Sequence, residues 1–239
     1  MTIGFTLHEE SGSHYGSSPY ATSSHTPTAN ALQVVGVLVE SGNADDASGI
    51  AGCGLTWHLL DTIAATGNNV GRIYVFYSMG ASPSTGALSI TTGAHDVVAW
   101  SWIEFTGVDT SGVDGAGAIV QSAKAQTTTS GSGGSVTATL AAFASANNWT
   151  YGFGFVDTYG GLPVVGSGFT AAGAGYDSAG YGACRAEYLA GNDTTVDMSN
   201  TTAYVDMAVI ALEIKAASGG GGFNPAWAKN SNNIIGMAA

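Results

Sequence analysis

The chain has 239 residues, of which 9% are charged, and its formal net charge is −12 with only five Lys and Arg in total. So few cations exclude a nucleic-acid-binding surface, which needs several Lys or Arg against phosphates, and they disfavour anionic membranes. The 36 glycines favour strands joined by tight loops over helices. No apolar run reaches the roughly 18–20 residues of a membrane span. The N-terminal residues carry no signal-peptide pattern, so we expect synthesis in a cytoplasm.

Alternating or continuous apolar runs separated by Gly-rich turns predict short strands along the whole chain. The first expected strand covers 3–8, and the Ser/Thr/His-rich stretch 9–30 is expected to cross the surface in extended form. Further strands are expected at 31–41, 55–62, 72–79, 87–92, 96–105, 117–123, 135–141, 149–157, 183–190 and 203–215. The Ala-rich stretch 139–148 is the one short helix that we expect. This series predicts an all-β fold, an antiparallel β-sandwich or jelly roll with Gly-rich loops.

Two strands are expected at the centre of this fold. In the segment VVAWSWIEF, period-two alternation places Val98, Trp100 and Trp102 on one face. The other face carries Val97, Ala99, Ile103 and Phe105. The segment from Met207 to Ile214 is apolar on both faces, which predicts that both are covered.

The C-terminal end differs from the body, so we expect a β-sandwich domain over 1–217 and a linker with an extended arm over 218–239. Four glycines at 219–222 form the hinge. The apolar residues that we expect to bind a partner are Phe223, Pro225, Trp227, Ile234 and Ile235. Burial gives about 1.5–3 kcal/mol per large side chain, but ordering the backbone costs about 1 kcal/mol or more per residue. The arm therefore also needs backbone hydrogen bonds, either on its own body or, as we favour, on a neighbouring subunit.

No pattern in the chain indicates catalysis. The Gly-rich stretch 49–57 lacks the Lys of a phosphate loop, so we interpret it as a tight entry to a strand. Acids on predicted strands could pair as in glycosidases, but each is isolated among small residues. These acids are Glu104, Asp157, Glu187 and Glu213. We therefore expect no catalytic residue and no enzyme activity.

Metal-binding patterns are also missing. The residues His8, His14 and His25, with Glu9 and Glu10, have no metal-ligand spacing, so we interpret the histidines as solvated surface residues. We expect neither a metal nor a cofactor.

Two further sets of residues leave alternatives open. For Cys53 and Cys184 we favour two separate buried thiols over a disulfide across the sandwich. Three loop tyrosines, Tyr159, Tyr176 and Tyr181, are either ordinary loop residues or a contact surface for a receptor or glycan.

Several stretches taken together resemble a known group of proteins. They are LQVVGVLVES, GLTWHLLDT, RIYVFYSMGA, VVAWSWIEFTGVDTSGVDG, AEYLAGNDTTVDMS and NPAWAKNSN. From about residue 31 onward the chain resembles β-sandwich proteins of tailed-bacteriophage structural modules, which serve as head-decoration (cement) proteins or as tail and fibre proteins. It departs from their pattern at Cys53, where a Gly is expected.

The resemblance implies a non-enzymatic virion protein, made in the host cytoplasm, that binds other virion proteins and copies of itself. An alternative is a phage adhesin module that binds a host surface glycan or another receptor. A third hypothesis is a jelly-roll glycosidase.

Overall fold

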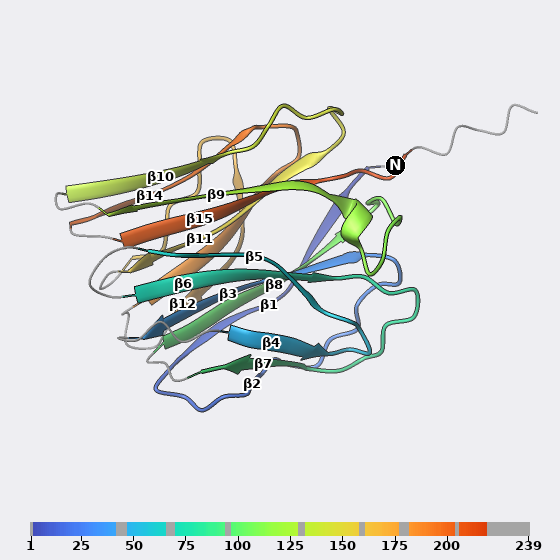
Figure 1. The fold of residues 1–239 in the computed structure, drawn as a ribbon, viewed down its shortest axis with the longest axis horizontal. Helices are drawn as coiled ribbons and strands as arrows, with labels where there is room; N and C mark the ends of the chain where they lie inside the picture. Colours follow the sequence, from blue (N-terminus) through green and yellow to red (C-terminus); the bar gives the residue numbers. More distant parts are fainter. Residues whose placement is uncertain are drawn as a thin grey trace, which may run out of the picture.

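The computed structural model describes residues 2–41, 47–65, 70–93, 97–128, 132–157, 161–176, 182–203 and 206–218. Within these residues the chain forms fifteen strands and one 3₁₀ turn, and it contains no α-helix (Figure 1). The first half contains β1 (Gly4–His14), β2 (Tyr20–Ala21), β3 (Leu32–Ser41), β4 (Ala47–Gly52), β5 (His58–Ala64), β6 (Val70–Ser78), β7 (Leu88–Thr92) and β8 (Val97–Thr106). The second half contains η1 (Ala116–Ala118), β9 (Ile119–Thr128), β10 (Ser132–Thr139), β11 (Trp149–Asp157), β12 (Thr170–Tyr176), β13 (Gly182–Leu189), β14 (Thr195–Ala203) and β15 (Asp206–Ile214).

The strands form four antiparallel sheets that stack face to face (Figure 1). The outer N-terminal sheet has the order β2-β7-β4, and the inner N-terminal sheet has the order β1-β8-β3-β6-β5. The inner C-terminal sheet has the order β12-β13-β11-β15-β9, and the outer C-terminal sheet consists of β10 and β14. The predicted antiparallel β-sandwich is confirmed, and each half of the chain supplies one of its two inner sheets.

Strand β8 shows how the sequence pattern produces these layers. Val98, Trp100 and Trp102 point into the apolar cluster between the two N-terminal sheets. Ala99 and Phe105 point the other way, into the central cluster between the two inner sheets. The predicted division of this strand into two apolar faces is therefore confirmed.

Strand β15 plays the same part in the C-terminal half. Its even-numbered residues from Ala208 to Ile214 face the central cluster. Met207, Val209 and Ala211 face a third cluster beneath the outer C-terminal sheet. Both faces are covered, as predicted, because the chain adds an outer sheet on this side too.

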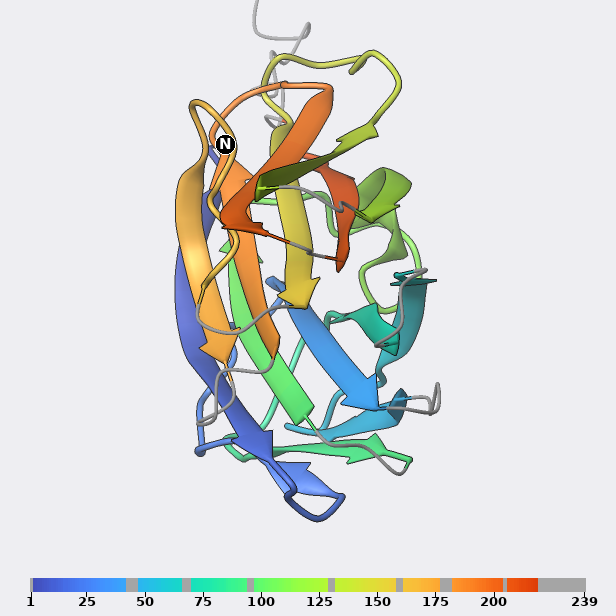
Figure 2. The ribbon, with the colours of Figure 1, turned by 90° about the vertical axis from the view of Figure 1, so that its left-hand side faces the viewer.

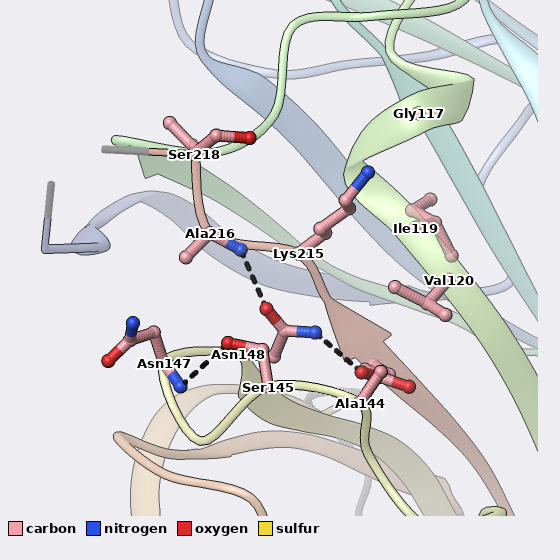
Figure 3. A pocket seen from close by; sticks show the side chains of 12 residues that line it. Gly117, Ile119, Val120, Ala144, Ser145, Asn147, Asn148, Lys215, Ala216 and Ser218 are labelled. Carbon is pink, nitrogen blue, oxygen red and sulfur yellow. Dashed lines mark hydrogen bonds between the residues drawn. The ribbon is translucent and has the colours of Figure 1, made fainter. Parts of the chain in front are cut away.

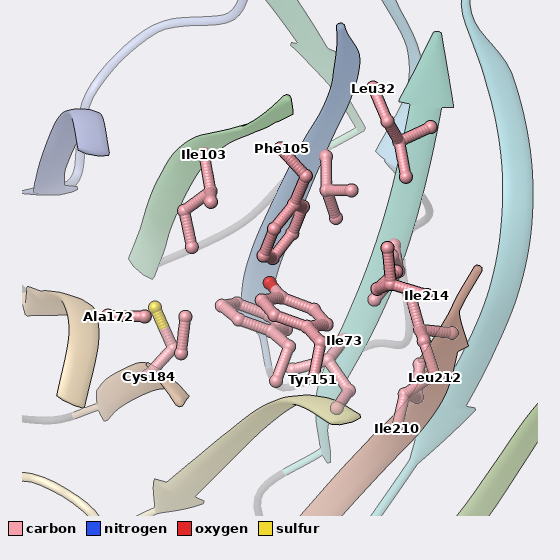
Figure 4. Close-up of a cluster of buried hydrophobic side chains, with 14 of the residues drawn as sticks. Leu32, Ile73, Ile103, Phe105, Tyr151, Ala172, Cys184, Ile210, Leu212 and Ile214 are labelled. Atoms are coloured by element: carbon pink, nitrogen blue, oxygen red, sulfur yellow. The ribbon is translucent and has the colours of Figure 1, made fainter. Parts of the chain in front are cut away.

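The central cluster joins the two halves of the chain (Figure 4). Leu32 and Phe105 come from the inner N-terminal sheet, and Tyr151 and Leu212 come from the inner C-terminal sheet. The rings of Phe105 and Tyr151 pack edge to face, with centroids 5.8 Å apart. Because both halves contribute to this core, we expect them to unfold together.

The edges of the two inner sheets meet on both sides of the sandwich. On one side, β12 packs against β1 and β8 (Figure 2). A Cβ atom at Gly175 would lie 2.6 Å from the Ser11 carbonyl oxygen, so only glycine permits this approach. On the other side, Lys124 Nζ of β9 lies 2.6 Å from Asp61 Oδ1 of β5. These edges are therefore shielded from pairing with other chains.

Two local predictions are wrong. The stretch 9–30 is not a surface crossover over its first residues, because β1 continues to His14 in register with β8 after a bulge between Leu7 and Glu9. The stretch 139–148 is not helical. There the side chain of Gln121 bonds both the N–H and the carbonyl oxygen of Ala141, at 2.9 and 3.0 Å, and holds the backbone extended.

Strands β2, β4, β12 and β14 were not predicted from the sequence. Three of them contain mainly Gly, Ala, Ser, Thr and Asn, which give little apolar alternation, and β2 has only two residues.

Candidate functional site

After β15 the described chain continues along the body to Ser218, on a path that backbone hydrogen bonds define. The Lys215 N–H donates to the Ala118 carbonyl oxygen at 2.8 Å, and the Lys215 carbonyl oxygen accepts from the Asp109 N–H at 2.9 Å. The Ala217 N–H then donates to the Gly107 carbonyl oxygen at 2.9 Å. Residues 215–217 are therefore held on the body by their backbone.

A pocket of about 430 Å³ lies beside residues 215–218 (Figure 3). Its walls come from η1 and the start of β9, including Ile119 and Val120, and from the loop before β11, including Ala144. Ser218, the last described residue, also lines it. Protein pockets that take small-molecule-sized groups begin at about 300 Å³, so one large side chain can enter.

Glu213 and Lys215 line this pocket, and both already have partners; Lys215 Nζ lies 2.7 Å from Asp109 Oδ2. Glu213 is 1% exposed, and its two carboxylate oxygens accept hydrogen bonds from Asn148 Nδ2 and Gln121 Nε2, each at 2.6 Å. Asn148 Oδ1 accepts the N–H of Ala216 at 3.1 Å. Because these partners satisfy the carboxylate, the pocket does not need a cation and suits an apolar occupant.

The residues predicted to bind a partner follow directly from this point. Phe223, Pro225, Trp227, Ile234 and Ile235 lie outside the described residues, so their interactions stay a prediction. The structure describes the chain up to Ser218, five residues before Phe223. No sequence pattern marked Val120, Gln121 or Ala144 as neighbours, because only the fold brings β9 and the loop before β11 together.

The described residues that flank the tyrosines predicted as a receptor surface lie at one end of the inner C-terminal sheet. Tyr159 and Tyr181 fall outside the described residues, and only the backbone of Tyr176, the last residue of β12, is described. Asp157, which precedes the first of these segments, is paired with Gly182, which follows the second. The described residues on either side of 158–160 and of 177–181 are therefore neighbours at the same end of the sheet.

The two cysteines are free, and the hypothesised disulfide between Cys53 and Cys184 is wrong for this structure. Cys53 lies in the cluster between the N-terminal sheets, whereas Cys184 lies in the central cluster (Figure 4). Burial raises the pKa of the Cys53 thiol, and it raises the pKa of Cys184 to about 12. Both are therefore inert, separate buried thiols, as the favoured interpretation has it.

Glu104 anchors a polar cluster on the outward face of the inner N-terminal sheet. Its Oε2 atom accepts the N–H of Thr28 at 2.7 Å and Nε2 of Gln33 at 2.8 Å, and it lies 3.2 Å from His8 Nε2. Burial opposes its charge, but these hydrogen bonds prevail and lower the pKa of the carboxyl to about 2. Glu104 is therefore a structural anion that fastens the segment after β1 to the sheet.

His8 and His25 are not the solvated surface residues that we expected, and the side chain of His14 lies outside the described ones. The side chains of His8 and His25 are 10% and 25% exposed, because both pack against the ring of Trp102. His25 Nε2 lies 3.4 Å from Glu9 Oε2. Among the described residues, no group of three or more His, Cys, Asp or Glu is placed to hold a metal ion.

Glu187 of β13 is fully buried and poorly paired. Its Oε2 atom accepts the N–H of Gly166 at 2.7 Å, while no partner is present for Oε1 among the described residues. Burial raises the pKa of this carboxyl to about 8, with the charge of Asp197 adding to the effect. Glu187 is therefore largely protonated at neutral pH.

The glycosidase hypothesis needs two acids at one cleft, and the strongest candidates are separated. Glu104 shares the outward face of the inner N-terminal sheet with Trp102. Glu187 and Glu213 lie on the outward face of the inner C-terminal sheet. Both inner sheets stand between Glu104 and these two acids, so Glu104 and Glu187 do not form a pair.

In the described part of the chain, no helix is long and apolar enough to cross a membrane. A scan against protein-family models, a search of curated proteins and a search of solved structures each found no match to this chain.

Proposed function

We propose that this protein is a non-enzymatic structural protein that assembles with neighbouring subunits, of the kind that decorates a phage capsid or joins a phage tail. The observation that carries the proposal is the end of β15. There β15, which is buried on both faces, is followed by residues 215–218, which backbone hydrogen bonds hold beside the pocket. The sequence then continues with four glycines and an apolar segment.

The body supports this proposal in a second way. Its inner sheet edges are shielded by one another, and the buried acids Glu104 and Glu213 are engaged in hydrogen bonds that hold the fold. A stable body with shielded edges and one attached apolar segment suits a building block that contacts neighbours through that segment.

Truncation after Ser218 tests the proposed function. We expect the shortened chain to keep its strand-rich circular dichroism and cooperative unfolding, because every described core cluster lies before this point. Self-association in solution, measured by light scattering, and incorporation into particles are expected to fall at least about tenfold, since the apolar contacts are lost.

A matched control replaces the glycines at 219–222 by serines, which keeps the linker flexible and the apolar segment intact. This control should assemble like the unchanged chain. Unchanged assembly of the truncated chain would contradict the proposal, and loss of its soluble fold would show that the segment belongs to its own body.

A receptor-binding or glycan-binding module is a second candidate, and the shared end of the described residues that flank the tyrosine-bearing segments favours it. A Tyr159→Ala, Tyr181→Ala double variant should lose glycan or host-cell binding while assembling normally. If binding is the same in the unchanged chain and in the variant, this candidate is wrong.

A further inference from the structure

Residues 161–169 cross the outward face of β13, and we refer to them as the strap. Because β13 lies between β11 and β12 in the inner C-terminal sheet, the connection from β11 to β12 has to pass over it. Gly166 and Phe169 of the strap are buried, whereas Val164 is 46% exposed. Phe169 packs in the cluster beneath the outer C-terminal sheet. The strap is therefore part of the cover of the inner sheet.

Few backbone hydrogen bonds hold the strap. Val164 and Ser199 of β14 exchange two of them: the Val164 N–H donates at 2.7 Å, and the Ser199 N–H donates back at 3.0 Å. The Phe169 N–H donates to the Gly166 carbonyl oxygen at 3.1 Å, which closes a turn within the strap. Strand β14, by contrast, is paired with β10 over Thr195–Ala203. The strap is therefore easier to displace than β14.

The carboxyl group of Glu187 lies directly under the strap. Glu187 is 0% exposed, and its Oε2 atom accepts the Gly166 N–H at 2.7 Å. A Cβ atom at Gly152 would lie 3.2 Å from its Oε1 atom and 2.4 Å from Val196. A Cβ atom at Gly166 would lie 3.2 Å from Asp197 Oδ2. The strap, β11 and β14 thus enclose this carboxyl group on the outward face of β13.

Two charged side chains face this carboxyl group, Asp197 of β14 and Arg185 of β13. The Asp197 carboxylate opposes a charge on Glu187 more strongly than Arg185 favours it. The strap has the sequence GLPVVGSGF, and Gly152 of β11 and Ala171 of β12 flank Glu187 across the sheet, so none of these elements adds a titratable group there. Burial is the largest cause that raises the pKa of Glu187 to about 8. An ionised Glu187 is therefore poorly compensated under a closed strap.

Movement of the strap offers the ionised carboxyl group access to water. In water its pKa would return to the ordinary value of 4.5. The preference for the closed strap is therefore complete below pH 4.5 and is lost as pH rises toward 8. Between these values the ratio of open to closed molecules should rise about tenfold per pH unit, because the open state binds one proton fewer.

We propose that the strap is a proton-controlled cover, which closes over Glu187 when this carboxyl group is protonated and opens when it ionises. Opening exposes Leu162, Val165 and Phe169, which pack against the cluster beneath the outer C-terminal sheet, and it frees the backbone of Ser199. Loss of the proton thus gives β14 an unpaired edge, to which another strand can add. The cover does not involve residues 219–239, so its failure would leave the proposed function untouched.

Hydrogen exchange of the full chain, followed by mass spectrometry from about pH 5.5 to about pH 8.5, measures this opening. The protection of peptide 161–169 should fall about tenfold per pH unit up to about pH 8 and should stay below that of peptide 207–214 in β15. In Glu187→Gln, which has no proton to lose, it should stay constant within about threefold. Equal protection of the two peptides, a strap protection independent of pH, or the same fall in Glu187→Gln would each overturn the proposal.

A reversible lock tests whether the strap is the part that moves. Residues that exchange both backbone hydrogen bonds, as Val164 and Ser199 do, have Cα atoms about 5.5 Å apart, within the range of a disulfide. A Val164→Cys, Ser199→Cys double variant should exchange at least about tenfold more slowly in the strap at about pH 8.5 when oxidised than when reduced. The native Cys53 and Cys184 are buried and stay outside this bond. Equal exchange in the oxidised and reduced forms would overturn the proposal.

Discussion

Glu104 in the N-terminal half and Glu187 in the C-terminal half are both buried glutamates on strands of an inner sheet, and the protein treats them in opposite ways. Three groups, from His8, Thr28 and Gln33, surround one oxygen of Glu104. Glu187 receives a single N–H, from Gly166. The pKa of the first carboxyl falls to about 2 and that of the second rises to about 8.

The difference shows that burial alone does not decide whether a carboxyl group is protonated. Both glutamates are at most 2% exposed, so desolvation opposes the charge of each. The number of hydrogen-bond donors decides the outcome, since several donors stabilise the anion and one donor does not. The N-terminal half therefore holds a carboxylate that ties segments together, while the C-terminal half holds a neutral acid that fills space.

The largest expected effect comes from removing the anchor of the N-terminal cluster. Glu104→Ala should lower the free energy of unfolding by about 3–5 kcal/mol at pH 7, because it leaves the buried donors of Thr28 and Gln33 unpaired. Urea denaturation followed by tryptophan fluorescence measures this.

The matched variant is Glu187→Gln, which copies the shape of the neutral acid and keeps an oxygen for the Gly166 N–H. Near pH 4.5, where the native carboxyl has not yet lost its contribution, it should change stability by less than about 1 kcal/mol. At pH 7 it should be more stable than the unchanged chain, because Gln has no proton to lose in the unfolded state. If the two substitutions cost the same, the contrast between the two sites is wrong.

The pH dependence of stability should show two opposing limbs. Glu187 has its pKa raised from 4.5 to about 8, so its contribution is complete below pH 4.5 and is lost as pH rises toward 8. The loss over the full limb is on the order of 5 kcal/mol, at about 1.36 kcal/mol per pKa unit. Glu104 has its pKa lowered to about 2, so its contribution is present above pH 4.5 and is lost as pH falls toward 2.

Denaturation curves recorded at several values from pH 3 to pH 9 measure the free energy of unfolding along the acid limb and along the alkaline limb. Glu187→Gln should flatten the limb above pH 4.5 and leave the acid limb unchanged. A variant that keeps the full alkaline slope would assign that slope to another group.

The smallest effects concern the thiols, one in each half. Without reductant, the unfolded chain should take up two equivalents of an alkylating reagent, because Cys53 and Cys184 are free. In the native state both should react slowly, and Cys53 first, since Cys184 is the more deeply buried and its pKa is about 12. Intact mass spectrometry counts the labels, and an unfolded chain without labels would restore the disulfide.

Much of the candidate site could not be predicted from the sequence, and the reason is physical. Val120, Asn148 and Ser218 lie in separate segments and become neighbours only around the end of β15. The sequence around each of them does not predict a pocket, because a pocket forms only where separate segments pack together. The sequence did indicate that a hinge and an apolar segment follow the last strand.

The strand conformation of residues 9–14 was likewise determined by contacts outside the local sequence. Its polar residues match no strand pattern, yet pairing with β8 extends the strand, and Glu9 and Glu10 find donors in Trp100 Nε1 and the Ala174 N–H. Long-range hydrogen bonds thus outweigh a weak local preference.

Period-two apolar alternation specified the all-β class, the two faces of β8 and the cover on both sides of β15, because side-chain direction along a strand follows from the backbone. The stacking of four sheets, the ionisation of Glu104 and Glu187 and the pocket at the end of β15 were decided by the tertiary structure. These three features depend on contacts between residues that are far apart in the sequence, and a local sequence pattern does not specify such contacts.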